Sequence, residues 1–323
     1  MIKPLRISDK LFLYAVNTLI YIRYPHHIIR FRRKVGYFPN VAAPGLYHEK
    51  MLWRKIFDHN PVFTTFCDKL ATKAYVRSIL PYAAIPETAW VGTDVGKIPQ
   101  DLDKSRFVLK GNHGVNINYF FNRQEFNPVH LTQITENWLN TTFGVEDHQW
   151  GYADAQKLLF LEELIDVSDG DELVEISVRA SNRKPILCSA YINNKLDNMK
   201  YGYFGIHGER IYKCNRNIPQ QYMLSNEFEL PACFNQAVEY ASLLSKNIDY
   251  ARYDFICAGE KLYVGEITVY PAAGLTHYIP HTCDDLINEQ WDISTSWFLS
   301  TRQQGWKDIY ADILRNHLDG RMT

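Results

Sequence analysis

The 323-residue sequence has no excess of charge of either sign. Its 35 lysines and arginines nearly balance 36 aspartates and glutamates, which gives a formal net charge of -1. Without a basic field, nucleic acid is not the expected partner. Hydrophobic residues make up 46% of the chain and charged residues 22%. These fractions indicate a globular protein, and the length predicts two or three domains.

The cysteines lack the spacing of a metal site. All six are far apart and none forms a C-x-x-C pair: Cys67, Cys188, Cys214, Cys233, Cys257 and Cys283. Zinc ligands and the dense disulfides of small secreted domains are therefore not expected. We expect reduced thiols in a cytoplasmic enzyme.

Long apolar runs are also absent, so a membrane-spanning helix is not expected. The run 11–22 has no cleavage site typical of a signal peptide. Basic residues follow it closely: Arg23, Arg30, Arg32, Arg33 and Lys34. Two interpretations remain open. The run forms either a helix lying on the inner membrane face, held by anionic lipids, or a helix packed on the protein body.

Residues 106–114 contain two glycines and a lysine but form neither a Walker motif nor G-x-G-x-x-G. We expect a buried strand over 107–109 that ends in Lys110 and leads into the glycine loop. A second strand is expected near 116–121. Glycines let backbone N–H groups approach an anion, and a lysine adds positive charge, which suits phosphate binding. A β-turn with a solvated lysine fits the same residues.

The remaining chain alternates predicted helices and strands, without repeats. Apolar periodicity predicts helices over residues 47–57, 62–80, 129–139, 233–246 and much of 284–318. Strands are expected over 157–166, 173–179 and 186–192. The first of these contains Glu162 and Glu163, which either cap a strand end in water or form a hinge for a nucleotide base.

Residues 193–217 are rich in glycine and basic residues. They predict a mobile loop that binds substrate, with Lys200 and Arg210 as candidate contacts. A charged loop that is simply solvated is the alternative.

Two β-rich runs, 252–257 and 262–269, flank Gly259-Glu260-Lys261 and predict a hairpin. With the loop centred on Glu260, Ala258 faces Leu262 and Ile256 faces Val264. The same register makes Asp254 face Glu266 and Arg252 face Thr268.

Opposed carboxylates with Cβ atoms about 5 Å apart repel one another unless a positive group lies between them. A divalent cation is one solution, and oxygen ligands suit Mg²⁺. In the alternative, one carboxylate faces solvent and the other pairs with Arg252. A register slip of one residue would also separate Asp254 from Glu266.

Five motifs follow one another along the chain. They are P-G-L-Y-H-E-K-M-L-W-R-K-I-F-D at 44–58, D-K-L-A-T-K-A-Y-V at 68–76, F-V-L-K-G-N-H-G at 107–114, L-E-E-L at 161–164, and R-Y-D at 252–254 with G-E-I-T-V-Y-P-A-A-G at 265–274. In this order they resemble the ATP-grasp superfamily, and within it the TupA-like amidoligases named for teichuronopeptide biosynthesis. The resemblance covers residues 36–274.

The resemblance implies an α+β ATP-grasp fold, in which a nucleotide is held between two α+β subdomains. We expect a helical N-terminal extension over 1–60, a smaller subdomain with the phosphate loop over 61–160, and a larger subdomain with the metal hairpin and a helical tail over 161–323.

It also implies roles for individual residues. Lys69 and Lys110 would hold the ATP phosphates, and Glu162 would bind the adenine amine. The remaining ATP contacts would be His113 and Gly114 in the phosphate loop and the hinge residues Glu163, Leu164 and Ile165. The phosphate loop departs from the usual family pattern, because Val115 and Asn116 follow N-H-G.

For the metal, the resemblance implies Mg²⁺ held by Asp254 and Glu266, with Thr268 as a third ligand where many relatives have asparagine. Arg252 would face the transferring phosphoryl group. Arg179 would replace a lysine of the branch and join Lys200 and Arg210 as a substrate contact.

The implied activity is an ATP-dependent ligase that joins a carboxylate to an amine through an acyl phosphate. The expected substrate is a uronic acid or amino acid of a bacterial surface polysaccharide, and the expected location is the cytoplasm, with peripheral contact to the inner membrane face. A glycosyltransferase that uses a D-x-D triplet, either Asp101-Leu102-Asp103 or Asp169-Gly170-Asp171, is the alternative. A non-catalytic ATP-binding protein of the same fold is another.

Overall fold

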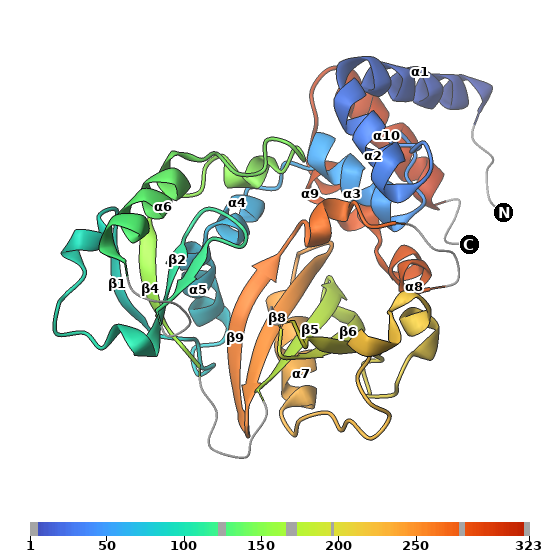
Figure 1. The fold of residues 1–323 in the computed structure, drawn as a ribbon. Coiled ribbons are helices and arrows are strands. Elements are labelled where there is room, and N and C mark those ends of the chain that lie inside the picture. Colours follow the sequence, from blue (N-terminus) through green and yellow to red (C-terminus); the bar gives the residue numbers. More distant parts are fainter. Residues whose placement is uncertain (1–5, 122–126, 166–172, 195–196, 278–281, 320–323) are drawn as a thin grey trace.

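The computed structural model describes residues 6–121, 127–165, 173–194, 197–277 and 282–319. The triplet Asp169-Gly170-Asp171 lies outside these ranges. Two antiparallel sheets form two lobes, and a helical layer covers one end of the larger lobe (Figure 1). No helix within the described ranges is long and apolar enough to cross a bilayer.

The smaller sheet has four strands in the order β1-β4-β2-β3. The strands are β1 (Thr88–Gly92), β2 (Phe107–Gly111), β3 (Asn118–Phe120) and β4 (Leu159–Glu163). Helix α6 (Pro128–Asn140) packs on this sheet, where Leu131 joins Leu109, Leu159 and Leu161 in a small separate core. The predicted subdomain boundary at residue 160 falls inside β4.

The larger sheet has five strands in the order β7-β6-β5-β8-β9. The strands are β5 (Leu173–Ser181), β6 (Lys184–Ile192), β7 (Lys200–Phe204), β8 (Ala251–Ala258) and β9 (Lys261–Thr268). Burial alternates along β8. Tyr253 and Phe255 join the main core with the apolar side of α7 (Phe234–Leu244). Arg252 and Asp254 therefore project from the opposite, polar face.

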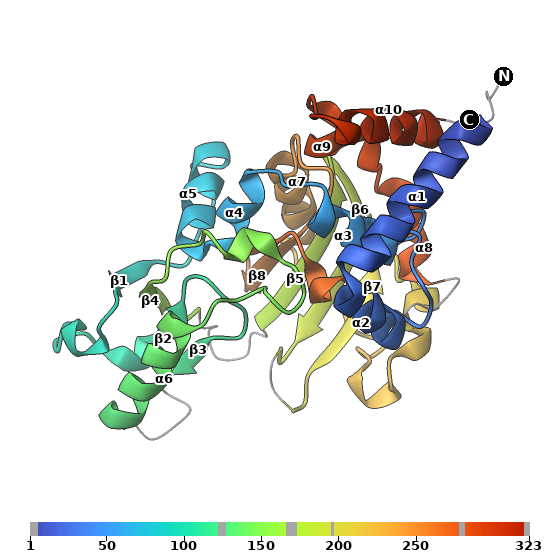
Figure 2. The same ribbon diagram turned by 90° about the horizontal axis from the view of Figure 1, so that it is seen from above.

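Helices from both ends of the chain form the helical layer (Figure 2). They are α1 (Ile7–Arg23), α2 (Pro25–Val35), α3 (Tyr47–Ile56), α8 (Cys283–Gln290), α9 (Trp297–Ser300) and α10 (Trp306–Asp319). The Trp53 indole donates to the Tyr310 hydroxyl over 2.9 Å, and that hydroxyl donates to the Ala42 carbonyl over 2.9 Å. The N-terminal segment is thus fastened to the C-terminal helices.

The single helix predicted over 62–80 is two helices, α4 (Val62–Cys67) and α5 (Lys69–Ile79). Asp68 separates them because it adopts an extended conformation, with φ -107° and ψ 111°, and its carboxylate accepts from the Ala71 N–H. This is an N-cap, which satisfies a free donor of the first turn. Lys69 consequently occupies the first position of α5.

The predicted hairpin register is right at its functional end and wrong at its turn. Asp254 pairs with Glu266 and Arg252 with Thr268, but Ala258 pairs with Lys261. The loop contains only Gly259 and Glu260, and a bulge next to Asp254 restores the register. Gly265 lies in this bulge, where an added Cβ would lie 3.1 Å from the Asp254 carbonyl oxygen.

Two further expectations are wrong. Residues 200–204 of the expected loop form β7, paired with β6. Cys214 and Cys283 form a disulfide with Cα atoms 5.1 Å apart, so the expectation of six free thiols fails at this pair. The fold brings together two cysteines separated by 69 positions, a proximity that their spacing does not reveal. The other four cysteines are free and buried.

Candidate functional site

Charged side chains from the two sheets lie within electrostatic reach of one another. Burial lowers the pKa of Lys69, while Glu266 of the larger sheet raises it, and Lys110 and Glu162 of the smaller sheet also act on it. Effects of this kind require short separations between the charged groups. We call this set the inter-sheet site; it comprises Lys69, Lys110, Glu162, Arg252, Asp254 and Glu266.

Lys69 holds the glycine loop that follows β2. Its ammonium donates to the Gly111 carbonyl over 3.1 Å and to the Gly114 carbonyl. The Leu70 N–H also donates to the Asn112 side chain over 2.9 Å. The start of α5 and the loop are therefore one assembly, as expected for two elements that bind the same ligand.

The glycines of this loop are required by packing. A Cβ at Gly111 would lie 2.2 Å from Ile117, and one at Gly114 would lie 2.7 Å from Phe143. His113 is buried, and its Nε2 lies 2.9 Å from the Trp138 carbonyl of α6. The imidazole of His113 thus points toward α6, so the group that this residue could direct to a ligand is its backbone N–H.

Glu162 is held by two lysines. One carboxylate oxygen lies 2.8 Å from the Lys73 ammonium, and the other pairs with Lys110. Burial raises the pKa of Glu162, but Lys110 and Lys73 outweigh burial and hold it below its usual value. Lys73 also donates to the Pro86 carbonyl over 2.7 Å. Glu162 therefore stays ionised and orders both lysines.

The predicted hinge residues begin at the C-terminal end of β4, which lies between β1 and β2 in the smaller sheet. The Glu163 N–H donates to the Glu87 carbonyl over 2.8 Å, and the Leu164 N–H donates to the Arg106 carbonyl over 2.9 Å. Ile165 is the last residue before a gap in the described ranges. A cavity of about 440 Å³ adjoins the hinge, with Glu163, Arg77 and Tyr263 in its wall.

Asp254 and Glu266 are cross-strand neighbours with different surroundings. Arg252 donates to both oxygens of Asp254 over 2.6 to 3.0 Å, and the Ser177 hydroxyl donates to Asp254 over 2.6 Å. Among the described residues, Glu266 has no hydrogen-bond or ion-pair partner. Arg252 also reaches the Thr268 hydroxyl over 3.4 Å. Asp254 is therefore paired with Arg252, as one interpretation of the sequence expected, and also lies opposite Glu266, as the other expected.

The chemistry of these donors fits Mg²⁺. Two carboxylates and a hydroxyl supply oxygen ligands only, and Mg²⁺ usually completes its shell with water and phosphate oxygens. Within the described part of the chain, no group of three or more histidine, cysteine or acidic side chains is arranged to hold a metal. A cation bound here would fill its remaining coordination positions with water or with oxygens of a bound phosphate group.

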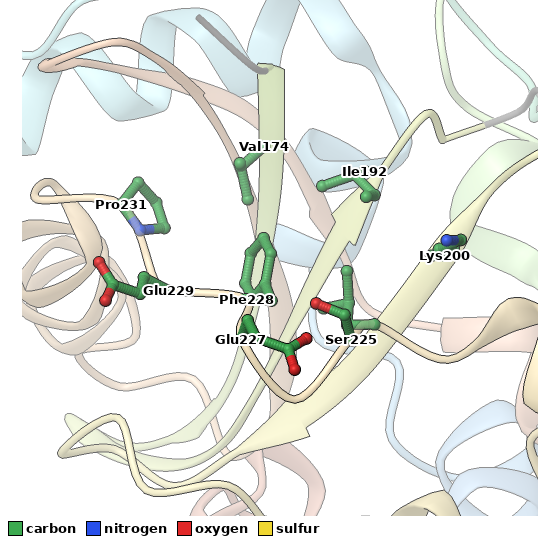
Figure 3. A pocket seen from close by; sticks show the side chains of 9 residues that line it. Val174, Ile192, Lys200, Ser225, Glu227, Phe228, Glu229 and Pro231 are labelled. Carbon is green, nitrogen blue, oxygen red and sulfur yellow. The ribbon is translucent and has the colours of Figure 1, made fainter.

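The three predicted substrate residues do not lie together. Arg179 is paired in register with Arg252 on the polar face of the larger sheet. Lys200 is in register with Ile192, and Ile192 with Val174, on the opposite face. There Lys200 lines a cavity of about 390 Å³ with the carboxylates Glu227 and Glu229 (Figure 3).

Arg210 binds the protein backbone. Its guanidinium donates to the carbonyls of Ser225 and Leu224 over 2.5 and 2.8 Å and lies over the Phe204 ring. In the D-x-D triplet at 101–103, the Asp103 carboxylate is also engaged by the protein, because it accepts from the Ser105 N–H and hydroxyl. Asp103 thereby caps a short helical turn.

Sequence reasoning missed Lys73 and Ser177 as site residues. Lys73 lies four positions after Lys69 on α5, the spacing that places two side chains on one helix face, so the signal was present. Ser177 is opposite Asp254 in register. Its proximity depends on which strands are neighbours, which the local sequence does not specify.

We compared the chain with protein families, curated proteins and solved structures. The family model described as TupA-like ATPgrasp matches residues 49–291. No curated protein matches the sequence. D-alanine--D-alanine ligase from Bacillus anthracis complexed with ATP is 19% identical, over 70% of this chain and 65% of that chain, with a TM-score of 0.37.

Two other solved structures are similar at lower identity. The ATP-grasp ligase PsnB, complexed with a variant of its minimal precursor, Mg and ADP, is 13% identical over 72% of this chain and 61% of that chain, with a TM-score of 0.38. The macrocyclase MdnC from Microcystis aeruginosa MRC is 13% identical over 75% of this chain and 68% of that chain, with a TM-score of 0.35. This chain spans less than two thirds of the B. anthracis ligase in its ATP complex and of PsnB. Because the family model covers most of the sequence, the chain belongs to the TupA-like ATP-grasp family and has the α+β ATP-grasp fold.

Proposed function

We propose that the protein is an ATP-dependent carboxylate–amine ligase. The terminal phosphoryl group of ATP passes to a carboxylate oxygen and ADP leaves. An amine then attacks the acyl carbon, and phosphate and a proton are released as the amide forms. The observation that carries the proposal is the packing of α5, which begins at Lys69, against β9, which carries Glu266. Lys69 also holds the glycine loop after β2, and the charge of Glu266 acts on it. Lysines suited to phosphates and carboxylates suited to a metal therefore meet between the two sheets.

In this proposal Lys69 and Lys110 bind the ATP phosphates. Both ammonium groups are engaged by the protein itself, Lys69 by loop carbonyls and Lys110 by Glu162. These contacts hold the lysines in place before ATP arrives, which lowers the cost of ordering them. The backbone N–H groups of His113 and Gly114 are proposed to bind the phosphates as well.

The adenine ring is proposed to lie at the hinge formed by Glu163, Leu164 and Ile165. The Glu162 carboxylate is occupied by Lys73 and Lys110. Its proposed contribution to adenine binding is therefore to position these lysines and the strand end, in addition to the amine contact that the family resemblance implies.

Asp254, Glu266 and Thr268 are the proposed Mg²⁺ ligands. When bound, the ion neutralises charge on the phosphate oxygens during phosphoryl transfer. Arg252 holds Asp254 in place through two parallel hydrogen bonds. Its guanidinium is proposed to bind the transferred phosphoryl group and to stabilise the acyl phosphate, because a guanidinium can donate two parallel hydrogen bonds to phosphate oxygens.

The proposed carboxylate substrate is a uronic acid or amino acid of a bacterial surface polysaccharide, and the proposed compartment is the cytoplasm, where ATP is available. Arg179 is the substrate contact that the geometry favours, since it lies beside Arg252. Lys200 and Arg210 remain proposals with less support, because Lys200 lies on the other face of the sheet and Arg210 binds the backbone.

The test is thermal unfolding with ATP and Mg²⁺ compared with uridine diphosphate sugars. A ligand at a hundredfold excess over its Kd adds about 2.7 kcal/mol to native stability. ATP with Mg²⁺ is expected to raise Tm and the nucleotide sugars are not. Stabilisation by a nucleotide sugar alone would favour the glycosyltransferase. ATP binding without ADP formation in the presence of carboxylates and amines would favour the non-catalytic protein.

The proposal includes a peripheral contact between α1 and the inner membrane face. Leu13, Val16 and Ile20 bury one side of this helix. The other side carries a second apolar stripe, with exposed fractions between 64% and 78% at Ile7, Leu11, Tyr14 and Ile22. Exposed cations lie nearby on α2, at Arg32, Arg33 and Lys34. An exposed apolar face near positive charge is typical of helices that bind anionic lipid surfaces.

Vesicle co-sedimentation tests this contact. The protein is expected to bind phosphatidylglycerol-containing vesicles more strongly than phosphatidylcholine vesicles. The double variant Leu11→Ser, Ile22→Ser should lose binding without losing stability, since both side chains face solvent. Equal sedimentation of the double variant and the unmodified protein would contradict the proposal.

A further inference from the structure

The polar face of the larger sheet extends beyond the inter-sheet site. One row across the strands runs from Glu266 through Asp254, Ser177 and Ser189 to Tyr203. Neighbouring strands are about 4.8 Å apart, so the row reaches about 14 Å from Asp254 to the strand that carries Tyr203. The far end of this row is occupied by aromatic side chains.

Three tyrosines of β6 and β7 form a continuous, half-buried group there. The rings of Tyr191 and Tyr201 are stacked, with centroids 5.5 Å apart and planes inclined by 18°. Tyr203 meets Tyr201 edge to face at 6.2 Å. The buried Ser189 hydroxyl donates to the Tyr191 hydroxyl over 3.2 Å. Ser189 thus holds the Tyr191 hydroxyl and lies opposite Tyr203 in register.

Arg179 borders the tyrosines on the side of the inter-sheet site. Its guanidinium carbon lies 5.8 Å from the centroid of the Tyr203 ring, and its Nη1 donates to the Ser189 hydroxyl over 3.3 Å. No carboxylate of the described chain forms an ion pair with it, although Arg252 lies beside it on the next strand. Two adjacent arginines, only one of them paired with a carboxylate, favour the binding of an external anion.

We propose that Arg179, Tyr191, Tyr201 and Tyr203 form a carbohydrate-binding platform for the carboxylate substrate. The proposal rests on the ligase function and identifies its substrate as a uronic acid in glycosidic linkage. Aromatic faces bind the C–H faces of pyranose rings, and arginine binds a carboxylate in two parallel hydrogen bonds. Arg179 is close enough to Tyr203 for one uronosyl unit to contact both.

Two features favour a glycoside over a free amino acid. An amino acid brings an ammonium group that needs an acidic partner. The carboxylate beside the tyrosines is Glu175, in register with Tyr191, and it already accepts a hydrogen bond from Asn194 over 2.6 Å. The platform itself contributes a guanidinium, hydroxyls and ring faces. The row is also longer than one monosaccharide, so a linked sugar can occupy the tyrosines while the reacting end approaches Arg252.

The experiment is calorimetric binding in the presence of AMP-PNP and Mg²⁺. The probes are methyl β-D-glucuronide, a glucuronate-containing disaccharide and L-glutamate. The disaccharide is expected to bind more tightly than the monosaccharide, and L-glutamate more weakly than both. Tyr201→Ala should weaken disaccharide binding about tenfold, as loss of one aromatic contact does.

Controls separate the platform from general damage to the fold. Tyr201→Leu keeps an apolar side chain without the ring and should lose the same affinity, whereas Tyr82→Ala, at a tyrosine that is 97% exposed, should lose none. The affinity for AMP-PNP should stay unchanged in all three variants. Undiminished disaccharide binding by both Tyr201 variants would overturn the platform while leaving the ligase function intact. A protein that binds AMP-PNP and L-glutamate but neither glucuronoside would overturn it as well.

Discussion

Two clusters of charged side chains in this protein differ in how much of their surface solvent can reach. Where the helical layer meets the larger sheet, Arg54 of α3 and Asp249, just before β8, form an ion pair of 2.8 Å with exposed fractions of 0% and 1%. The rings of Trp291 and Phe63 cover the guanidinium at 4.5 and 4.8 Å. In the inter-sheet site, the side chains of Lys110 and Arg252 keep exposed fractions of 25% and 27%.

The difference separates charges that fasten the fold from charges available to a ligand. Arg54 also donates to the Val269 carbonyl just after β9, and the Trp291 indole donates to Asp249. This closed cluster therefore connects α3, β9 and the segment after α8. Glu266 has no such partner among the described residues. Substitutions in the closed cluster should accordingly change mainly the free energy of unfolding, and substitutions in the inter-sheet site should change mainly ATP binding and turnover.

The largest effect on stability is expected from Asp249→Asn. It removes the charge that pairs with the buried Arg54 and leaves Asp58, which acts on Arg54 without a hydrogen bond to it. We expect this to cost about 3 to 5 kcal/mol of unfolding free energy. Urea denaturation measures this loss. The double variant Arg54→Met, Asp249→Leu is the control and should recover most of it, because an apolar pair removes both charges. A loss below about 1 kcal/mol for Asp249→Asn would contradict the structural role.

Lys110→Ala and Lys69→Ala should instead weaken ATP binding by at least about tenfold, or about 1.4 kcal/mol, with a smaller change in stability. Leu109→Ala is the matched control from the same strand. Its side chain is fully buried, so it should cost about 2 to 5 kcal/mol of stability and leave the nucleotide affinity of the folded protein unchanged. Calorimetry with AMP-PNP distinguishes the cases. Full affinity in both lysine variants would exclude the phosphate role.

The closed cluster should also depend on pH near neutrality. Burial and the charge of Asp249 raise the pKa of Asp58 to about 7. The folded protein then binds a proton that the unfolded chain releases near pH 4, so this contribution to stability falls as pH rises from about 4 to 7. Asp58→Asn keeps the oxygen that accepts from the Phe298 N–H over 2.8 Å and removes the titration.

The measurement is the difference in unfolding free energy between Asp58→Asn and the unmodified protein. It should increase with pH by at most about 1.4 kcal/mol per unit over this range and level off above pH 7. Using the difference cancels the buried histidines, which titrate in the opposite sense. A difference that does not vary between pH 5 and pH 8 would contradict the assignment. Glu162, whose pKa is lowered, should contribute no slope there, because its stabilisation is lost only as pH falls below its unfolded value of about 4.5.

The smallest effect is expected from Ser177→Ala. It removes one hydrogen bond to Asp254 but leaves the Arg252 bonds that orient the carboxylate. Turnover should fall only a few fold, equivalent to about 1 kcal/mol, and ATP affinity should not change. A loss as large as that of Asp254→Asn would show that Ser177 is part of the chemistry. Steady-state kinetics of both variants make this comparison.

The sequence predicted the parts of this site that depend on local pattern. Asp254 and Glu266 were placed opposite each other because alternating strands around a glycine loop fix side-chain direction. The pairs near the turn were wrong because the two-residue loop and the Gly265 bulge shift the register by one residue and then restore it. The break at Asp68 was also missed, although aspartate is a strong N-cap.

Contacts between distant segments could not be predicted from local sequence patterns. Lys200 looked like a loop residue because its strand is short and glycine-containing, and pairing with β6 is what makes it a strand. The positions of Lys73 against Glu162 and Arg179 against Tyr203 follow from packing of separate strands and helices. The same holds for the Cys214–Cys283 disulfide. Local patterns predicted the types of residue at the site, and tertiary packing decided which of them meet.

The most direct test of the ligase proposal is Mg²⁺-dependent ADP formation by Glu266→Gln. Because the Glu266 side chain has no hydrogen-bond or ion-pair partner among the described residues and acts on Lys69 and Arg252 through its charge, the substitution should leave Tm nearly unchanged in the absence of ligands. If Glu266 binds Mg²⁺ with Asp254, ADP formation with a carboxylate and an amine should fall by at least about a hundredfold. Full ADP formation by Glu266→Gln, with the same dependence on Mg²⁺ as the unmodified protein, would contradict the account.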